Sequence, residues 1–256
     1  MFGDPIGHSL SPLLHNTALT ATGLQGTYVA RRVDAAGMQA VVEEIRTGDL
    51  DGGNVTMPHK ELAARLCDRL AASAARAGAV NTLVRVGGQV IGHNTDVPGI
   101  TDAWSAAALP TAGPILILGA GGAAAAAALA LEGRELAITS RNLERAAELT
   151  SQLCVAASVV PWGRPLAGAV IVNATPIGMQ GESLDQEQLA AAAGLFDMPY
   201  GPQETPAVRH MRELGRPVAD GRLMLLHQAA AAFSLWTGRG APVAEMWAAL
   251  AAKPAS

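Results

Sequence analysis

The stretch ILILGAGGAAAAAALALEG, residues 115–133, predicts the fold of the second half of the chain. An apolar run, a glycine-rich turn and an alanine-rich segment follow one another, which is the order of strand, loop and helix in a dinucleotide-binding unit. Gly119 allows the tight turn, Gly121 lets backbone approach a pyrophosphate, and Ala124 permits close packing of helix on strand. We expect phosphate at the N-terminus of a helix from Ala123, where backbone N–H groups are free. The alternative is an alanine-rich turn without a ligand.

The residues about 20 positions further on indicate which dinucleotide is bound. NAD enzymes place an acid there for the ribose 2′-hydroxyl, but the segment AITSRNLERAAEL, residues 137–149, has Ser140 and Arg141 after its apolar run and Arg145 one helical turn later. An arginine can bind a 2′-phosphate through charge-assisted hydrogen bonds, which an acid would repel. The segment therefore favours NADP, and the alternative makes both arginines solvated charges at a helix end.

Apolar runs alternate with helical patterns along both halves of the chain, which predicts an α/β fold. In the first half we expect strands at 28–33, 53–56 and 82–86 and helices at 12–22, 35–47 and 61–70, forming a mostly parallel sheet. In the second half we expect strands at 115–118, 136–139 and 170–173 and helices at 123–133 and 143–153. Residues 109–114 are a plausible joint between the halves, and helices are predicted at 223–236 and 243–252.

Composition excludes several classes of protein. The chain has 256 residues, 50% of them apolar, and a net charge of −4, so it lacks the basic excess that nucleic acid or an anionic membrane would attract. Its two cysteines, Cys67 and Cys154, form neither a disulfide framework nor a zinc motif, which suits a cytoplasmic protein. The first residues lack the pattern of a signal peptide, and the uncharged run 114–131 is interrupted by glycines, so we expect no membrane span.

Polar residues of the first half gather in turns marked by glycine or proline. Ser9 and Ser11 precede Pro12, which can begin a helix, and their hydroxyls could meet a carboxylate or polyol there, although such a pair is more often a helix cap. Lys60 follows the turn at Pro58 in a first helical turn, where a cation is unfavourable to the helix dipole. Taken singly, Lys60 is more often a surface lysine, and Asp96 in GHNTD could equally be a cap.

Eight motifs in order identify a family. GDPIGHSLSP (3–12), NVTMPHK (54–60), GAVNTL (78–83), GHNTDVPG (92–99), GAGGA (119–123), NATPIGM (173–179), DMPYGP (197–202) and MLLHQAAAAFSLWTG (224–238) resemble the shikimate dehydrogenases at the family's approximate spacing. The resemblance covers nearly the whole chain. Two positions depart from it, since residues 140–142 are SRN where members usually have NRT, and Leu223 replaces a second glycine after Gly221.

The resemblance implies roles for particular residues. Lys60 and Asp96 become the catalytic pair. The substrate's carboxylate and hydroxyls would be held by Ser9, Ser11, Thr56, Asn81, Tyr200 and Gln228. NADP would be bound by Gly119, Ala120, Gly121, Gly122, Ala123, Ser140, Arg141, Arg145, Thr175, Met198 and Gly221, and no metal is implied.

The resemblance also implies an architecture and a reaction. Residues 1–98 with 222–256 would form the substrate-binding domain, residues 99–221 a Rossmann-type doubly wound NADP domain, and the final helices would pack back on the first domain. The reaction would be the reversible, NADPH-dependent reduction of 3-dehydroshikimate to shikimate by a cytoplasmic monomer or homodimer. The alternatives are a paralogue that oxidises quinate or an aminoshikimate, and a catalytically silent protein that senses a ligand.

Overall fold

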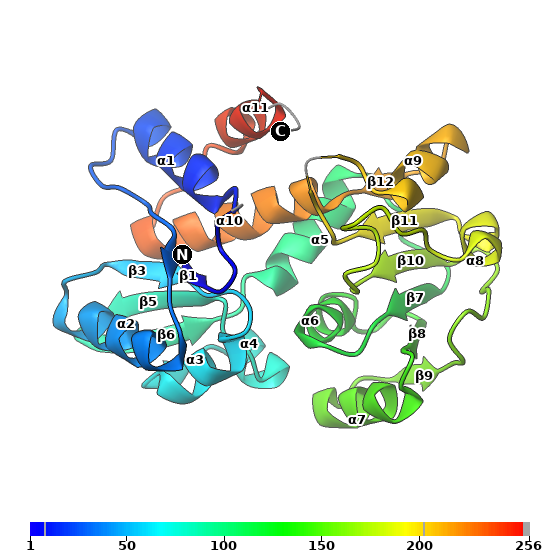
Figure 1. Ribbon diagram of the computed structural model, residues 1–256, viewed down its shortest axis with the longest axis horizontal. Helices are drawn as coiled ribbons and strands as arrows, with labels where there is room; N and C mark the ends of the chain where they lie inside the picture. Colours follow the sequence, from blue (N-terminus) through cyan, green and yellow to red (C-terminus); the bar gives the residue numbers. More distant parts are fainter. Residues whose placement is uncertain (8, 202, 253–256) are drawn as a thin grey trace. The chain divides into compact units, whose positions relative to one another are not determined.

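The computed structural model describes residues 1–7, 9–201 and 203–252, and the chain divides into two compact units. Unit 1 comprises residues 1–99 and the described residues from 225 onward, and unit 2 comprises residues 100–224. The chain crosses between them within two helices, α5 (Asp96–Ala106) and α10 (Gly221–Thr237) (Figure 1). Of the motif and domain residues expected above, His8, Pro202 and 253–256 lie outside the described residues.

Unit 2 contains a six-stranded sheet in which every pairing is parallel. Its order is β12-β11-β10-β7-β8-β9, which is the strand order of a doubly wound dinucleotide-binding fold. The strands are β7 (Ile115–Leu118), β8 (Leu136–Thr139), β9 (Ala157–Val159), β10 (Val170–Asn173), β11 (Gly194–Asp197) and β12 (Val218–Ala219). The Rossmann-type prediction is therefore confirmed. Residues 109–114, expected to join the two halves, lie inside unit 2.

The strands of unit 2 are mostly apolar because helices cover both faces of the sheet, and polar residues such as Asn173 and Asp197 stand at strand ends. All four residues of β7 are buried, and Leu116 and Leu118 pack in the cluster that includes Leu189 and Met211. The helices are α6 (Gly122–Ala130), α7 (Leu143–Leu153), α8 (Gln186–Ala191) and α9 (Pro206–Glu213) (Figure 1). Of these, α7, α8 and α9 begin at side-chain caps in which Asn142, Asp185 and Thr205 each accept a backbone N–H.

The sheet of unit 1 is mixed, so the expectation of a mostly parallel sheet is wrong. In the order β3-β5-β6-β4, the pairs β3–β5 and β5–β6 are antiparallel, and only β4–β6 is parallel. The cause is a hairpin between β5 and β6, because Gly87 and Gly88 both have positive φ and allow a two-residue turn. The strands are β3 (Gly52–Asn54), β4 (Arg69–Leu70), β5 (Thr82–Val86) and β6 (Gln89–His93), with β1 (Phe2–Gly3) and β2 (Arg31–Arg32) as a separate parallel pair.

Helices of unit 1 lie near the positions that the sequence predicted, except that the helix Ala72–Ala77 was not predicted and one predicted helix is shorter. The helix expected at 61–70 ends at Leu66, because Cys67 is extended and Arg69–Leu70 pairs with β6 as a strand. The helices are α1 (Ser11–Thr22), α2 (Ala35–Thr47), α3 (Lys60–Leu66), α4 (Ala72–Ala77) and α11 (Val243–Ala252). Helix α11 packs against α1, which confirms that the final helices return to the first domain.

Helix α10 is held against the sheet of unit 1 by Trp236. The indole Nε1 donates to the carbonyl of Leu83 at 2.9 Å, and a Cβ atom at Gly52 would lie 2.7 Å from that nitrogen, so the strand requires glycine there. His15 stacks on Tyr28 with ring centroids 4.3 Å apart and lies 5.0 Å from Trp236, which completes an aromatic cluster. Within the described ranges, no helix has the length and apolar content needed to cross a bilayer.

Candidate active site

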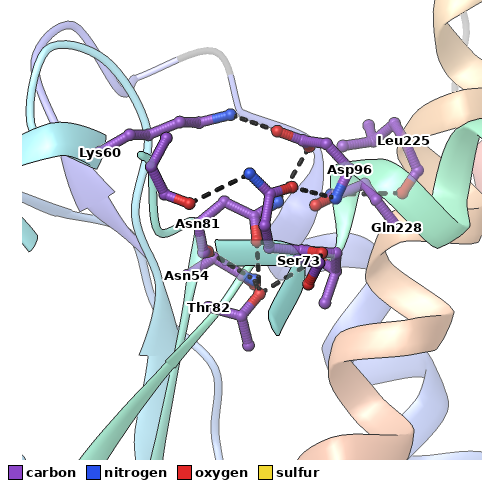
Figure 2. Close-up of polar contacts among 11 residues, drawn as sticks. Asn54, Lys60, Ser73, Asn81, Thr82, Asp96, Leu225 and Gln228 are labelled. Carbon is purple, nitrogen blue, oxygen red and sulfur yellow. Dashed lines mark hydrogen bonds and ion pairs between the residues drawn. The ribbon is translucent and has the colours of Figure 1, made fainter. Parts of the chain in front are cut away.

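Lys60 and Asp96 form an ion pair in unit 1. Nζ of Lys60 lies 2.7 Å from Oδ2 of Asp96, and the two side chains are 28% and 9% exposed (Figure 2). The two residues are 36 positions apart in sequence and begin helices α3 and α5. The structure thus brings together the two residues predicted to be catalytic and leaves the lysine partly open to solvent.

Backbone contacts fix the turn that presents Lys60. The His59 N–H donates to the carbonyl of Thr56 at 3.0 Å, and the buried His59 ring contacts the carbonyl of Val33 through Nε2 at 2.8 Å. The carbonyl of Lys60 accepts the N–H of Val80 at 2.9 Å. Because both ends of the turn are tied to other elements, the lysine backbone has a defined position from which its side chain reaches Asp96.

Asn81 links the Lys60–Asp96 pair to the sheet. Its Nδ2 donates to Oδ1 of Asp96 at 2.9 Å, and its backbone N–H donates to the carbonyl of His93 at 3.0 Å. The N–H of Asp96 donates to Oδ1 of Asn94 at 3.1 Å, so the acid is held by its backbone as well as by its carboxylate. Each carboxylate oxygen of Asp96 accepts one described donor and keeps acceptor capacity for a substrate hydroxyl.

The other predicted substrate residues are not hydrogen-bonded to this group within the described part of the chain. Ser11 is buried at the start of α1, and its N–H donates to Oγ of Ser9 at 3.2 Å. Thr56 lies half-buried in the turn before Lys60. Gln228 lies on α10 within unit 1, beside Gly99, where a Cβ atom would lie only 2.8 Å from Cβ of Gln228. Tyr200 belongs to unit 2, where burial raises the pKa of its phenol.

The glycine turn of unit 2 has the form that a pyrophosphate requires. A Cβ atom at Gly119, whose φ is +120°, would lie 2.9 Å from the carbonyl oxygen of Ala174, so the turn needs glycine. Cβ atoms at Gly121 and Gly122 would meet nothing within 4 Å. Helix α6 starts here without a side-chain cap, which leaves its first N–H groups for an anion. Ala120 and Ala123 lie in the same turn, and all five residues fit a dinucleotide.

The residues predicted to select the cofactor follow the neighbouring strand. Ser140 follows β8 directly, and its Oγ accepts the N–H of Asn142 at 3.3 Å. Arg141 and Arg145 are exposed, and neither side chain makes an ion pair or a hydrogen bond with a described residue. Parallel strands bring their carboxyl ends to one edge of the sheet, so these cations lie at the same edge as the glycine turn.

A cluster of buried polar side chains connects two loops at that edge. Nδ2 of Asn173, at the end of β10, donates to Oδ1 of Asp197, at the end of β11, at 2.7 Å. The hydroxyl of Thr175 donates to Oδ1 of Asn173 at 2.6 Å, and the hydroxyl of Thr205 donates to the second oxygen of Asp197. Burial raises the pKa of Asp197 to about 6, although the donors from Thr205 and Asn173 oppose this effect.

Two predicted cofactor residues adjoin this group. The N–H of Met198 donates to the carbonyl of Asn173 at 3.1 Å. A Cβ atom at Gly221 would lie 2.4 Å from the carbonyl oxygen of Met198 and 2.5 Å from that of Pro199. The start of α10 can therefore pack on the loop after β11 only because residue 221 is glycine.

The sequence motifs did not predict the buried polar residues that form hydrogen bonds with the predicted site residues or with their neighbours. In unit 1 they are Thr82 and Thr95, and in unit 2 they are Asn173, Asp197 and Thr205, all of them 4% exposed or less. One signal was available, because the dipeptide Asn-Thr occurs at 81–82 and again at 94–95, at two neighbouring strand ends. Polar residues that interrupt apolar strands are candidates for such networks, since buried polar groups need partners.

Two family models match segments that lie almost entirely in unit 1, and full-length relatives cover both units. Residues 1–83 match the model of the shikimate dehydrogenase substrate binding domain, and residues 221–251 match the shikimate 5′-dehydrogenase C-terminal domain. The chain is 41% identical over 248 residues to a protein of Gluconobacter oxydans named shikimate dehydrogenase (NADP(+)), covering 93% of this chain and 89% of that one.

Solved structures show the same likeness. Shikimate 5-dehydrogenase from Thermus thermophilus, in complex with NADP(H) and shikimate, is 36% identical, with a TM-score of 0.89 over 97% of this chain and 96% of that one. The ligand-free 5-ketofructose reductase of a Gluconobacter strain also has a TM-score of 0.89, at 26% identity over 98% of this chain and 96% of that one. On the full-length sequence identities and the motifs, this chain belongs to the shikimate dehydrogenase family.

Proposed function

We propose that the protein is an NADP-dependent shikimate dehydrogenase that interconverts 3-dehydroshikimate and shikimate. The observation that carries the proposal is the Lys60–Asp96 pair at 2.7 Å, in a unit that matches the family's substrate-binding domain. The glycine turn, the open N-terminus of α6 and the exposed Arg141 fit NADP. The relatives that are named for this reaction, and the relative that holds NADP(H) and shikimate, support the same assignment.

In the reductive direction, NADPH supplies a hydride to the C3 carbonyl of the substrate. The alkoxide that develops at this oxygen needs a proton, and the Lys60 ammonium both stabilises the charge and donates the proton. Asp96 orients that ammonium through Oδ2 and can accept a substrate hydroxyl. Asn81 donates an N–H to Asp96 and is proposed to contact the substrate as well. We place Ser9, Ser11, Thr56 and Gln228, all in unit 1, around the substrate's carboxylate and remaining hydroxyls, and the role of Tyr200 stays a prediction from the sequence.

Replacing Lys60 tests the catalytic assignment. We expect Lys60→Ala to lower kcat by about two to four orders of magnitude, the usual worth of a general acid-base group. Arg65→Ala, which removes an exposed cation from the same helix, is the matched control and should retain activity. A loss of less than tenfold in Lys60→Ala would make the lysine an ordinary binding residue.

Four substrate and cofactor combinations test the overall assignment. Absorbance of the reduced nicotinamide would be followed with shikimate and quinate, each with NADP and with NAD. We expect fast turnover only with shikimate and NADP. Activity with quinate or NAD would support the paralogue, and no activity in any combination would support a ligand sensor. Because a structurally similar protein is named a 5-ketofructose reductase, 5-ketofructose with NADPH is a further substrate to include.

Cellular location and assembly are also proposals. The thiols of Cys67 and Cys154 are free, which suits the reducing cytoplasm. A monomer or homodimer is the expected assembly, and light scattering on the purified protein measures it directly. We also propose residues 1–98 with 222–256 as the substrate-binding domain and residues 99–221 as the NADP domain.

A further inference from the structure

A chain of buried hydrogen bonds runs from the aromatic cluster of unit 1 to the carboxylate of Asp96. The Tyr28 hydroxyl donates to Oδ1 of Asn54 at 2.6 Å, and Nδ2 of Asn54 lies 2.9 Å from Oγ1 of Thr82. Oγ1 of Thr82 lies 3.0 Å from Oδ1 of Asn81, whose Nδ2 reaches Asp96 (Figure 2). Asn54 and Thr82 are 3% and 0% exposed, so neither is open to solvent.

The orientation of the Asn54 amide is determined by its neighbours. Its Nδ2 donates to the backbone carbonyl of Asn81 at 3.2 Å, and a carbonyl can only accept. Its Oδ1 faces the Tyr28 hydroxyl, and burial raises the pKa of that phenol, so the hydroxyl keeps its proton and donates. Asn54 must therefore present a donor, not an acceptor, to Thr82.

This orientation restricts the single proton of Thr82 to two acceptors. Because Asn54 donates to Oγ1, the Thr82 hydroxyl donates either to Oδ1 of Asn81 at 3.0 Å or to Oγ1 of Thr95 at 3.1 Å. Both routes end at the same amide oxygen, since the Thr95 hydroxyl lies 3.2 Å from Oδ1 of Asn81. Oδ1 of Asn81 also accepts the N–H of Thr95 at 2.8 Å. A flipped Asn81 amide would set its N–H groups against these donors and turn its oxygen toward the Asp96 carboxylate, which leaves buried groups unsatisfied.

We propose that Thr82 and Asn54 are positioning residues that hold the Asn81 amide as a hydrogen-bond donor toward Asp96 and the substrate. This inference rests on the proposed roles of Asn81 and Asp96. Neither positioning residue needs to touch the substrate, since both act through the Asn81 side chain. The consequence is that activity depends on the hydroxyl of a buried threonine next to the site.

Substitution of Thr82 by its isostere tests the inference. We expect Thr82→Val to lower kcat/KM for shikimate about tenfold, the worth of one hydrogen bond, and Thr82→Ser to restore it to within about twofold. The matched control is Thr139→Val, because Thr139 is also 0% exposed but its hydroxyl has no partner among the described residues. Circular dichroism and the Tm of each variant show whether the fold is kept.

A double-mutant cycle separates positioning from a general structural effect. If Thr82 acts through Asn81, Thr82→Val will change kcat/KM by less than about twofold in the Asn81→Ala background. The same tenfold loss in both backgrounds, a failure of serine to rescue, or no effect of Thr82→Val in the wild type would overturn the inference. A failure of the proposed function is distinct, because the wild-type protein would then not turn over shikimate at all, whereas an unchanged kcat/KM in Asn81→Ala would refute only the role of Asn81.

Discussion

Asp197 makes the stability of unit 2 depend on pH in a direction opposite to that of most paired carboxylates. Its side chain is 0% exposed, and burial raises its pKa from an ordinary value of 3.8 to about 6. The unfolded chain therefore releases the proton at a lower pH than the folded chain does. The contribution of Asp197 to stability is therefore greatest below about pH 4, falls between pH 4 and 6, and stays low above that window. Each pKa unit corresponds to about 1.4 kcal/mol, so the loss is about 3 kcal/mol.

Asp197→Asn removes this titration and can keep the hydrogen bonds. The remaining carbonyl can accept from Asn173, and the new N–H can donate to the Thr205 hydroxyl, which has two lone pairs. We therefore expect the variant's gain over the wild type to grow from near zero at pH 4 to about 2–3 kcal/mol above pH 6. The gain arises because asparagine carries no charge in the folded state. It should be absent below pH 4, where the Asp197 carboxyl of the wild type is protonated as well.

Urea unfolding at pH 4 and pH 8, followed by tryptophan fluorescence, measures this difference. Asp185→Asn is the control, because that exposed side chain caps α8 and asparagine caps a helix as well as aspartate does. Subtracting the unfolding free energy of the wild type from that of the variant removes the contribution of all other titrating groups, because they are the same in both proteins. If the difference in unfolding free energy were the same at both pH values within about 0.5 kcal/mol, the argument from burial would be refuted.

Three further substitutions test particular contacts. Arg141→Asp should raise the KM for NADP at least tenfold and leave the KM for NAD little changed, because the new carboxylate repels a 2′-phosphate. Steady-state kinetics measures both constants, and an unchanged ratio of KM for NADP to KM for NAD would show that Arg141 does not contact the cofactor. Gly221→Ala should lower stability by about 1–3 kcal/mol, because its Cβ would lie 2.4 Å from the Met198 carbonyl oxygen, and thermal unfolding measures this loss. Tyr28→Phe should cost about 1 kcal/mol in urea by deleting the hydrogen bond to Asn54, and an unchanged midpoint would contradict that contact.

Helices were the most predictable elements of the fold. The observed α2, α7 and α11 have the predicted bounds, because their apolar positions recur at helical spacing. Helix α5, which has Pro98 near its start, was not predicted. Proline is tolerated there because the first helical N–H groups have no partner within the helix. The hairpin at Gly87–Gly88 was missed for a different reason, as the βα rhythm on either side favoured parallel strands.

Motifs predicted residues of the candidate site, but they did not predict the hydrogen bonds that connect and orient those residues. Motifs pointed to Lys60, Asp96 and Asn81, and the structure joins these three directly. The residues that orient them are brought together by strand register, since Thr82 pairs with His93 and so lies two residues from Thr95 along the partner strand. A shift of one residue would turn Thr82 to the other face of the sheet and break the chain of hydrogen bonds. The donor-to-acceptor direction of these hydrogen bonds therefore depends on the register of the folded sheet, and no local pattern in the sequence predicts it.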